Sequence, residues 1–263
     1  MKYILGQHFL TSRKIIKRIC DYADLKRDDV VYEIGAGFGN LTVEIARRVK
    51  KVYAIEIDPK LFEILKENTE DFDNVELIHG DAVIEEIPSD CNKVMGNIPF
   101  SISSLITEKV LRKLANCEIE LALFMYQKEF AERILVPPGL KSFSRISFLA
   151  QYYSHPEMLE IIPRSFFRPI PKVDAALVKF NKKEGIKWDE KLNLFVKIIF
   201  SHKKKKVINA ISPYLDKWKV KEKIKSKLLE KRVFDLEFKE IEELKNLFEK
   251  EFPELFRKDE AKD

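Results

Sequence analysis

The chain has 263 residues, of which 45% are hydrophobic, and a formal net charge of +5. This apolar content is enough for a full core, and the length favours one large domain with a smaller appendage. No apolar run approaches the length of a membrane-spanning helix, and the first residues lack the apolar stretch of a signal peptide. We therefore expect a cytoplasmic protein without a membrane partner. The three cysteines have no Cys-x-x-Cys spacing, which argues against a disulfide framework or a metal site.

Apolar runs of strand length alternate with segments of helical period, which predicts an α/β fold with a mostly parallel sheet covered by helices. The expected strands are residues 30–34, 52–57, 75–79, 93–96 and 121–125, and the expected helices are residues 41–49, 61–69 and 105–114. After the turn residues Pro137, Pro138 and Gly139, two late strands at 157–162 and 173–180 could pair as an antiparallel edge.

The last third of the chain has a different pattern. The short polar segment 181–185 precedes it, so we expect a sheet-containing domain of residues 1–182 and a small helical domain of residues 186–263. The expected helices of the second domain are 194–200, 207–215, 224–229 and 241–252. Residues 181–263 carry a net charge of +6, whereas residues 1–180 carry −1. A basic helical domain without a strongly apolar face favours nucleic acid over a membrane as its partner.

Three features at the ends of successive strands indicate a ligand site. The turn after the first expected strand contains Gly35, Gly37 and Gly39, which let the backbone approach a ligand, although this spacing differs from the dinucleotide pattern. Glu56 ends the second strand, where a carboxylate can accept both hydroxyls of a ribose, and Asp81 follows the third, within reach of an adenine amino group. Each acid alone is as easily explained by a helix cap or a surface charge, but the ordered set favours an adenosine site.

The tetrapeptide Asn97-Ile98-Pro99-Phe100 follows the fourth expected strand. An exocyclic amine of adenine is a poor nucleophile, because its lone pair is delocalised into the ring. The Asn97 side-chain oxygen and a backbone carbonyl beside Pro99 could accept its two N–H bonds and localise the lone pair, while Phe100 stacks on the base. In isolation such a string is more often a strand end and a proline turn. Its position after the fourth strand favours methylation of a base amine.

This arrangement resembles the class I S-adenosylmethionine-dependent methyltransferases. Blocks at residues 6–10, 125–133, 167–176 and 200–205 are further similar to the ribosomal RNA adenine N6,N6-dimethyltransferase family, and the resemblance covers nearly the whole chain. The lysine-rich C-terminal part is most similar to the archaeal and eukaryotic branch. The resemblance implies a Rossmann-like mixed sheet, mostly parallel, with a small all-helical C-terminal domain, and S-adenosylmethionine as the cofactor.

The resemblance also implies a reaction and a partner. Two methyl groups would be transferred to N6 of each of two adjacent adenosines in the 3′-terminal hairpin of small-subunit rRNA, during ribosome biogenesis. The partner would be that rRNA in an immature small subunit, and the enzyme would act as a monomer without a metal. Residues 1–182 would bind the cofactor and carry out catalysis, and residues 186–263 would bind RNA.

The site residues follow from the matching motifs. The catalytic residues are Asn97, Pro99 and Phe100, and the expected cofactor residues are Gln7, His8, Leu10, Gly35, Gly37, Glu56, Ile57, Asp81, Ala82 and Asn97. Lys203, Lys204, Lys205 and Lys206 are expected to bind RNA phosphates, together with Lys219, Lys221, Lys223 and Lys225. Two positions depart from the family pattern, because His8 stands where Asn is frequent and Phe100 where Tyr is frequent.

Three other interpretations stay open at this point. A methyltransferase of large-subunit rRNA that confers antibiotic resistance shares nearly all of these motifs. A relative that serves mainly as an assembly or transcription factor would bind the cofactor without turnover. A nicotinamide dehydrogenase is disfavoured by the glycine spacing and by the absence of a hydride-transfer residue.

Overall fold

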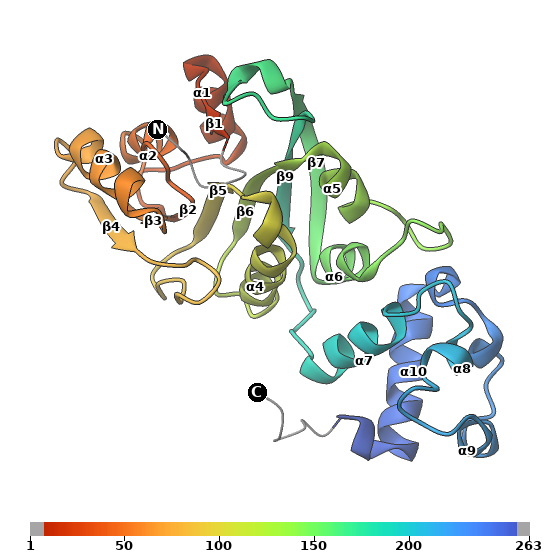
Figure 1. Cartoon of the computed structure of the whole chain (residues 1–263). Coiled ribbons are helices and arrows are strands. Elements are labelled where there is room, and N and C mark those ends of the chain that lie inside the picture. Colours follow the sequence, from red (N-terminus) through yellow and green to blue (C-terminus); the bar gives the residue numbers. More distant parts are fainter. Residues whose placement is uncertain (1–7, 257–263) are drawn as a thin grey trace.

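The computed structural model describes residues 8–256 and contains a helix-covered sheet followed by a cluster of helices (Figure 1). The strands are β1 (Phe9–Leu10), β2 (Val30–Ile34), β3 (Lys51–Glu56), β4 (Val75–His79), β5 (Lys93–Asn97), β6 (Leu121–Gln127), β7 (Ser154–Ile162), β8 (Phe167–Arg168) and β9 (Ala175–Lys182). The helices of the sheet region are α1 (Arg13–Tyr22), α2 (Asn40–Ala46), α3 (Pro59–Thr69), α4 (Ser103–Ala115), α5 (Lys128–Ile134) and α6 (Arg145–Tyr153).

The large sheet has seven strands in the order β4-β3-β2-β5-β6-β9-β7. The first five of these strands are parallel, and β9 runs antiparallel to both of its neighbours, β6 and β7. The predicted antiparallel pairing of the two late strands is therefore confirmed, with β9 inside the sheet and β7 at its edge. All seven strands were expected from the sequence. The short β1 pairs with β8 in a separate two-stranded sheet.

Alternate residues along the strands lie on opposite faces of the sheet and contribute to two hydrophobic layers. On one face, Val31 and Met95 pack with the helices α1, α2 and α3; on the other, Tyr32 and Phe124 pack with α4, α5 and α6. This is the period-2 burial expected of strands covered on both sides. The sequence did not predict α1, α5 or α6. For α1 a signal was present, because Ser12 caps the helix and accepts a hydrogen bond from the Ile15 N–H at 3.5 Å.

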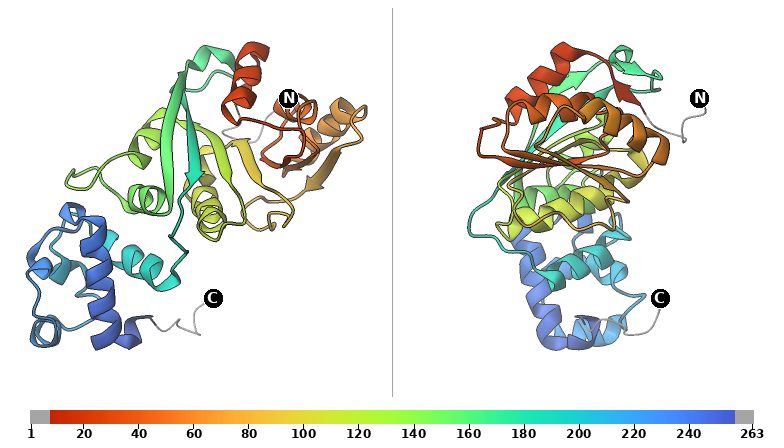
Figure 2. Two further views of the ribbon diagram at one scale, coloured as in Figure 1. Left: turned by 180° about the vertical axis from the view of Figure 1, so that it is seen from behind. Right: turned by 90° about the vertical axis from the view of Figure 1, so that its left-hand side faces the viewer.

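The chain after β9 forms a helical unit of α7 (Glu190–Phe200), α8 (Val207–Ala210), α9 (Lys217–Lys223) and α10 (Phe238–Glu251), which lies beside α6 in Figures 1 and 2. Short 3₁₀ turns complete it at Lys227–Glu230, Val233–Asp235 and Pro253–Phe256. The predicted helix at 224–229 is wrong. Ile224 caps the end of α9, and Ser226 starts a 3₁₀ turn by accepting a hydrogen bond from the Leu228 N–H.

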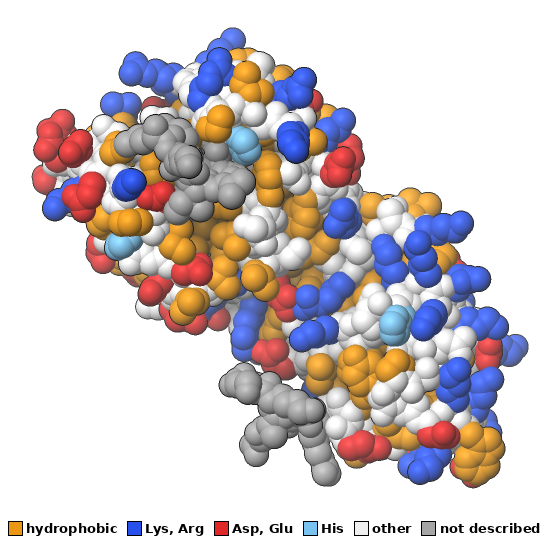
Figure 3. Space-filling view, viewed as in Figure 1, with side chains coloured by type: hydrophobic (Ala, Val, Ile, Leu, Met, Phe, Trp, Pro, Cys, Tyr) orange, Lys and Arg blue, Asp and Glu red, His pale blue; other side chains and the backbone are white. Residues whose placement is uncertain are grey.

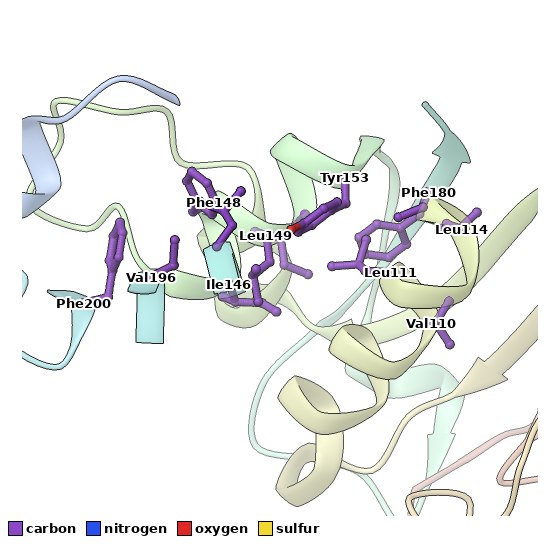
Figure 4. Close-up of a cluster of buried hydrophobic side chains, with 14 of the residues drawn as sticks. Val110, Leu111, Leu114, Ile146, Phe148, Leu149, Tyr153, Phe180, Val196 and Phe200 are labelled. Carbon is purple, nitrogen blue, oxygen red and sulfur yellow. The ribbon is translucent and has the colours of Figure 1, made fainter. Parts of the chain in front are cut away.

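The helical unit and the sheet region share one continuous core. Figure 4 shows side chains of α6, including Phe148 and Tyr153, between those of α4 and those of α7. The ring of Phe148 lies 5.5 Å from Phe238, and Phe143 lies 5.6 Å from Phe200. Helix α6 thus links the sheet to the helical unit. No helix within residues 8–256 has both the length and the apolar character needed to cross a bilayer.

Candidate active site

A cavity of about 400 Å³ opens at the carboxyl ends of the parallel strands, where ligands bind in open α/β sheets. Most of the predicted site residues line it. They are His8, Gly35, Glu56, Ile57, Asp81, Ala82, Asn97, Pro99 and Phe100. These residues come from four strand ends and from the segment before β1. The structure therefore brings together residues that lie up to about 90 positions apart in the sequence.

Glu56 is held at the end of β3 by the backbone. One carboxylate oxygen accepts the Gly37 N–H at 2.8 Å, and the other accepts the N–H groups of Ile57 and Asp58 at 3.0 Å each. Only 5% of Glu56 is exposed. Gly37 does not line the cavity, so its contribution is to orient Glu56. Its φ of +58° and the Phe9 ring, 3.0 Å from where a Cβ would lie, both require glycine there.

Asp81 begins the loop after β4. Its Oδ1 atom accepts the Val83 N–H at 2.9 Å, which fixes the carboxylate at the rim of the cavity. Lys109 of α4 supports the same loop by donating to the carbonyls of Ala82, at 2.9 Å, and of Glu85. Burial lowers the pKa of Lys109. Lys109 is a supporting residue that the sequence analysis missed, since nothing in an amphipathic helix pattern marks which lysine holds a distant loop.

Asn97 ends β5 with a defined side-chain orientation. Its Nδ2 atom donates to the His8 carbonyl oxygen at 2.7 Å, so the amide oxygen is the atom left to accept a hydrogen bond. The residue immediately before Asn97, Gly96, is required by close packing. A Cβ at this position would lie 2.4 Å from the Ile34 carbonyl oxygen of the neighbouring strand.

The segment that carries His8 is tied to the loop around β8. The His8 Nδ1 atom donates to the Pro169 carbonyl oxygen at 2.8 Å, and β1 pairs with β8 through Phe9 and Arg168. The His8 ring lies 5.8 Å from the Phe100 ring. His8 is thus at the cavity, and one of its ring nitrogens is occupied by a structural hydrogen bond. Gln7 falls outside the described residues.

Pro99 and Phe100 turn the chain from β5 into α4. The Pro99 carbonyl accepts hydrogen bonds from the Ile102 N–H and the Ser103 hydroxyl, both at 3.2 Å. The carbonyl of Ile98 has no such donor in the described part of the chain, and Ile98 also lines the cavity. Of these two carbonyl oxygens, that of Ile98 is therefore the one left without a donor among the described residues.

A second cavity of about 50 Å³ lies next to the first and shares Gly35 and Asn97 with it. Leu10 lines this smaller cavity. So does Glu33, a side chain 1% exposed whose Oε2 atom has no hydrogen-bond partner among residues 8–256. Burial, reinforced by the Glu56 carboxylate, raises the pKa of Glu33 to about 8. The sequence analysis missed Glu33, although a lone acid inside the apolar run Val30–Ile34 was a signal.

The segment 167–175 forms the remaining wall of the large cavity. Phe167, which is buried, and Pro171, Val173 and Ala175 all line it. In the sequence, this block was notable only because it resembles the corresponding block of the family. Its position at the site depends on the pairing of β8 with β1 and of β9 with β6, which no local pattern reveals. Within residues 8–256, no group of three His, Cys, Asp or Glu side chains is arranged to hold a metal ion.

A sequence model of the family described as ribosomal RNA adenine dimethylase matches residues 1–250. The chain belongs to this family. Two archaeal relatives are both named probable ribosomal RNA small subunit methyltransferase A. The protein of Pyrococcus furiosus is 41% identical over 91% of this chain and 90% of its own length, and that of Thermococcus gammatolerans is 42% identical over 90% and 85%.

Solved structures agree with this assignment to the rRNA adenine dimethylases. The dimethyladenosine transferase of Plasmodium falciparum is similar with a TM-score of 0.78 and 27% identity, over 92% of this chain and 98% of that one. The 23S rRNA methyltransferase ErmE is similar with a TM-score of 0.65 and 26% identity, over 90% and 99%. The predicted class I methyltransferase fold is confirmed, as is the prediction of an S-adenosylmethionine-dependent rRNA adenine dimethyltransferase. Family membership removes the dehydrogenase interpretation.

The four lysines expected to bind RNA in this family member lie outside the cavity and differ from one another. Lys203 donates to the carbonyls of Ser142 and Phe143, and burial lowers its pKa. Lys206 forms an ion pair with Glu230 at 2.8 Å. The ammonium groups of Lys204 and Lys205 make no hydrogen bond or ion pair with the rest of the described chain.

Proposed function

We propose that this rRNA adenine dimethylase transfers two methyl groups to N6 of each of two adjacent adenosines in the 3′-terminal hairpin of small-subunit rRNA. It would act as a monomer on an immature small subunit in the cytoplasm during ribosome biogenesis. The choice of subunit is supported by identity: 41% over nine-tenths of the chain to a relative named for the small subunit, against 26% to the 23S enzyme ErmE. The chemistry is supported by Asn97, whose amide is already oriented beside Ile98, Pro99 and Phe100.

The cavity suits S-adenosylmethionine. Its volume is within the range of small-molecule sites, and its two ends offer different chemistry. Glu56 and Asp81, with Ile57 and Ala82, would hold the adenosine part. Gln7, His8, Leu10 and Gly35 would hold the methionine part next to Asn97, with Gly37 acting through Glu56. When bound, S-adenosylmethionine supplies an activated methyl group on a positively charged sulfur.

The residues of this chain would orient the target adenine rather than remove a proton from it. The Asn97 amide oxygen and the Ile98 carbonyl oxygen would accept the two N–H bonds of the amine, because neither oxygen accepts a hydrogen bond within the described chain. Accepting both bonds would reduce the delocalisation of the nitrogen lone pair into the ring and direct it toward the incoming methyl group. The Phe100 ring would stack on the base and hold that plane. After the first transfer only one N–H bond remains, so a single acceptor would have to orient the monomethylated amine.

RNA binding would use the helical domain of residues 186–263. Of the four predicted lysines, we propose that Lys204 and Lys205 contact the phosphates, because the side chains of Lys203 and Lys206 are engaged within the protein. Each phosphate contact contributes to the salt dependence of binding. Replacing Lys204 and Lys205 with alanine should weaken RNA binding and lower the slope of log affinity against log salt by about 2. The matched variant Lys206→Ala should change that slope less, and an unchanged slope in the double variant would contradict the assignment.

The deciding experiment uses purified protein and labelled S-adenosylmethionine. Small ribosomal subunits and their free RNA, both lacking the modification, are incubated with the enzyme, digested, and analysed as nucleosides by mass spectrometry. We expect dimethyladenosine from the small-subunit RNA. Label in large-subunit RNA alone would move the protein to the resistance branch. Cofactor binding without any transfer would favour the role as an assembly factor.

A further inference from the structure

Helix α9 presents a tryptophan to solvent at the end of the helical unit. Trp218 is 70% exposed, whereas Val220 is the one residue of α9 that is buried. Two positions along a helix correspond to a rotation of about 200°, so Trp218 points away from the core that Val220 joins. Tyr214, in the turn that leads into α9, is also exposed at 53%. Exposure of most of a side chain this large is uncommon, and it indicates a binding role more often than exposure of a smaller apolar residue does.

The surroundings of Trp218 are strongly basic. Residues 201–232 contain 12 Lys or Arg and three Asp or Glu, a net charge of +9, so the positive charge of the last third is concentrated in this segment. Lys217 and Lys219 flank the tryptophan, are exposed, and have ammonium groups without a partner in the part of the chain that the structure describes. Figure 3 shows Lys and Arg side chains gathered over the helical unit and a hydrophobic group beside them at α9.

We propose that Trp218, Lys217 and Lys219, together with Tyr214, form a second RNA-binding surface, on which Trp218 stacks against an unpaired base while the lysines contact its phosphates. This inference rests on the proposed function, because it presumes an RNA substrate. Stacking on an aromatic ring tolerates any base, and adjacent cations add backbone contacts, which is how proteins hold single-stranded segments. We call these four residues the aromatic–lysine surface.

The chemistry of this surface favours RNA over other occupants. A stable protein interface has a continuous apolar centre, whereas here two aromatic rings stand among ammonium groups. An interfacial membrane helix has a broad apolar face, whereas the outward side of the seven-residue α9 carries a single apolar residue, Trp218. Unpaired nucleotides offer both a flat apolar base and a negative charge, so they match both components.

The location of the surface determines which part of the RNA it contacts. In Figures 1 and 2, α9 lies at the end of the helical unit away from the sheet, whereas the cavity lies at the carboxyl ends of β2, β3 and β5. The target adenosines must enter the cavity, so the base held by Trp218 belongs to a different part of the RNA. The contribution of Trp218 should therefore depend on the length of the substrate.

The first test uses the fluorescence of Trp218. The chain has two tryptophans, and Trp188 packs against Tyr153 with ring centroids 4.5 Å apart. In the Trp188→Phe variant all tryptophan emission comes from Trp218, and we expect strong quenching on titration with small-subunit RNA. Saturation is checked independently by the anisotropy of labelled RNA. Unchanged emission at saturation would overturn the proposal. If Trp188→Phe does not fold, the wild type is titrated in the same way. Quenching of its tryptophan emission then reports contact of RNA with the exposed Trp218.

The second test compares the variants Trp218→Ala and Trp218→Phe. The control variant is Ile161→Ala, because Ile161 is an exposed apolar residue of β7. We expect Trp218→Ala to bind full-length small-subunit RNA about 10-fold more weakly with an unchanged salt slope, and the isolated 3′ hairpin less than twofold more weakly. Trp218→Phe should restore part of the loss.

Three results would overturn the surface assignment: equal loss on both RNAs, loss of dimerisation in sedimentation, or loss of binding to vesicles of anionic lipid in place of RNA. The proposed function is judged separately by methylation with the wild type. If the wild type methylates neither RNA, that function fails, and the fluorescence titration still decides whether Trp218 binds RNA.

Discussion

The two ends of the parallel sheet surround their buried acidic side chains differently. At the amino ends of the strands, Lys93 lies 2.7 Å from Asp29, and Asn92 donates to the same carboxylate at 2.7 Å. Burial alone would raise the pKa of Asp29, but the hydrogen bonds from Lys93 and Asn92 bring it below its ordinary value. At the carboxyl ends, Glu33 and Glu56 are equally buried, and no ion pair forms between them and any Lys or Arg of residues 8–256.

The difference separates structure from function. A buried carboxylate paired with a cation is satisfied within the protein, and removing one partner is costly because it leaves the other charge buried and unpaired. A buried acidic side chain without a cation is costly to keep, and such groups cluster at ligand-binding sites. At the amino end, Asp29 thus has a cation and an amide as partners, whereas at the carboxyl end Glu33 keeps an oxygen without a hydrogen-bond partner among residues 8–256, beside the smaller cavity.

The largest expected effect is on the amino end. Lys93→Met leaves Asp29 buried without its cation and should lower the free energy of unfolding by about 3–5 kcal/mol, measured by urea denaturation. The folded fraction should keep its methyl-transfer rate, since neither residue lines the cavity. The double variant Asp29→Asn with Lys93→Met should regain much of the loss. A double variant as unstable as the single one would show that packing rather than charge is responsible.

The next effect is on activity at the carboxyl end. Asn97→Ala removes one of the two acceptors for the amine and should lower the single-turnover rate about 100- to 1,000-fold. Cofactor binding, followed by calorimetry with S-adenosylhomocysteine, should stay measurable, and the unfolding midpoint should change little. Asn68→Ala is the control, because that amide also donates to a carbonyl, of Phe38, but lies outside the cavity. Retained turnover in Asn97→Ala would exclude the proposed lone-pair role.

A smaller effect concerns pH. The pKa of Glu33 is about 8 in the folded chain and 4.5 when unperturbed, so between these values the folded state holds a proton that the unfolded state has lost. Stability should therefore fall as pH rises from about 5 toward 8, because the unfolded chain releases the proton that folded Glu33 retains. Glu33→Gln should remove this slope, whereas Glu67→Gln, on the exposed side of α3, should keep it. Parallel profiles for wild type and Glu33→Gln would contradict the assignment.

The smallest expected effect is on an exposed ion pair at the amino end of the sheet, which serves as a reference for the buried pair of Lys93 and Asp29. Lys51, at the start of β3, pairs with Glu76 at 2.8 Å in contact with solvent. Exposed pairs contribute little, because water screens both charges. Lys51→Met should leave the melting temperature nearly unchanged at physiological salt, in contrast to Lys93→Met at the same end of the sheet. A comparable drop for both variants would mean that burial does not distinguish them.

Local sequence patterns predicted those parts of the fold and the site that depend on interactions between residues close in the sequence. The strands were found because apolar runs between turn residues reflect burial on both sides, and Glu56, Asp81 and Asn97 could be placed together because parallel strands end at one edge. The wall formed by Phe167 and Val173 could not be placed at the site from the sequence, because its position depends on pairing between distant segments. Helix α9 was not predicted, because a helix that buries only Val220 shows no apolar period.

The β1–β8 pairing makes the cavity depend on completion of the chain. Thr11 donates its N–H to the Phe166 carbonyl at 3.0 Å, across a separation of 155 residues. During synthesis, β1 leaves the ribosome long before β8, so the two strands would pair only after the central strands have been made. A chain that ends before β8 could build five parallel strands and still lack one wall of its cofactor cavity. Methylating capacity would then arise late in synthesis, when nearly all of the sheet has left the ribosome.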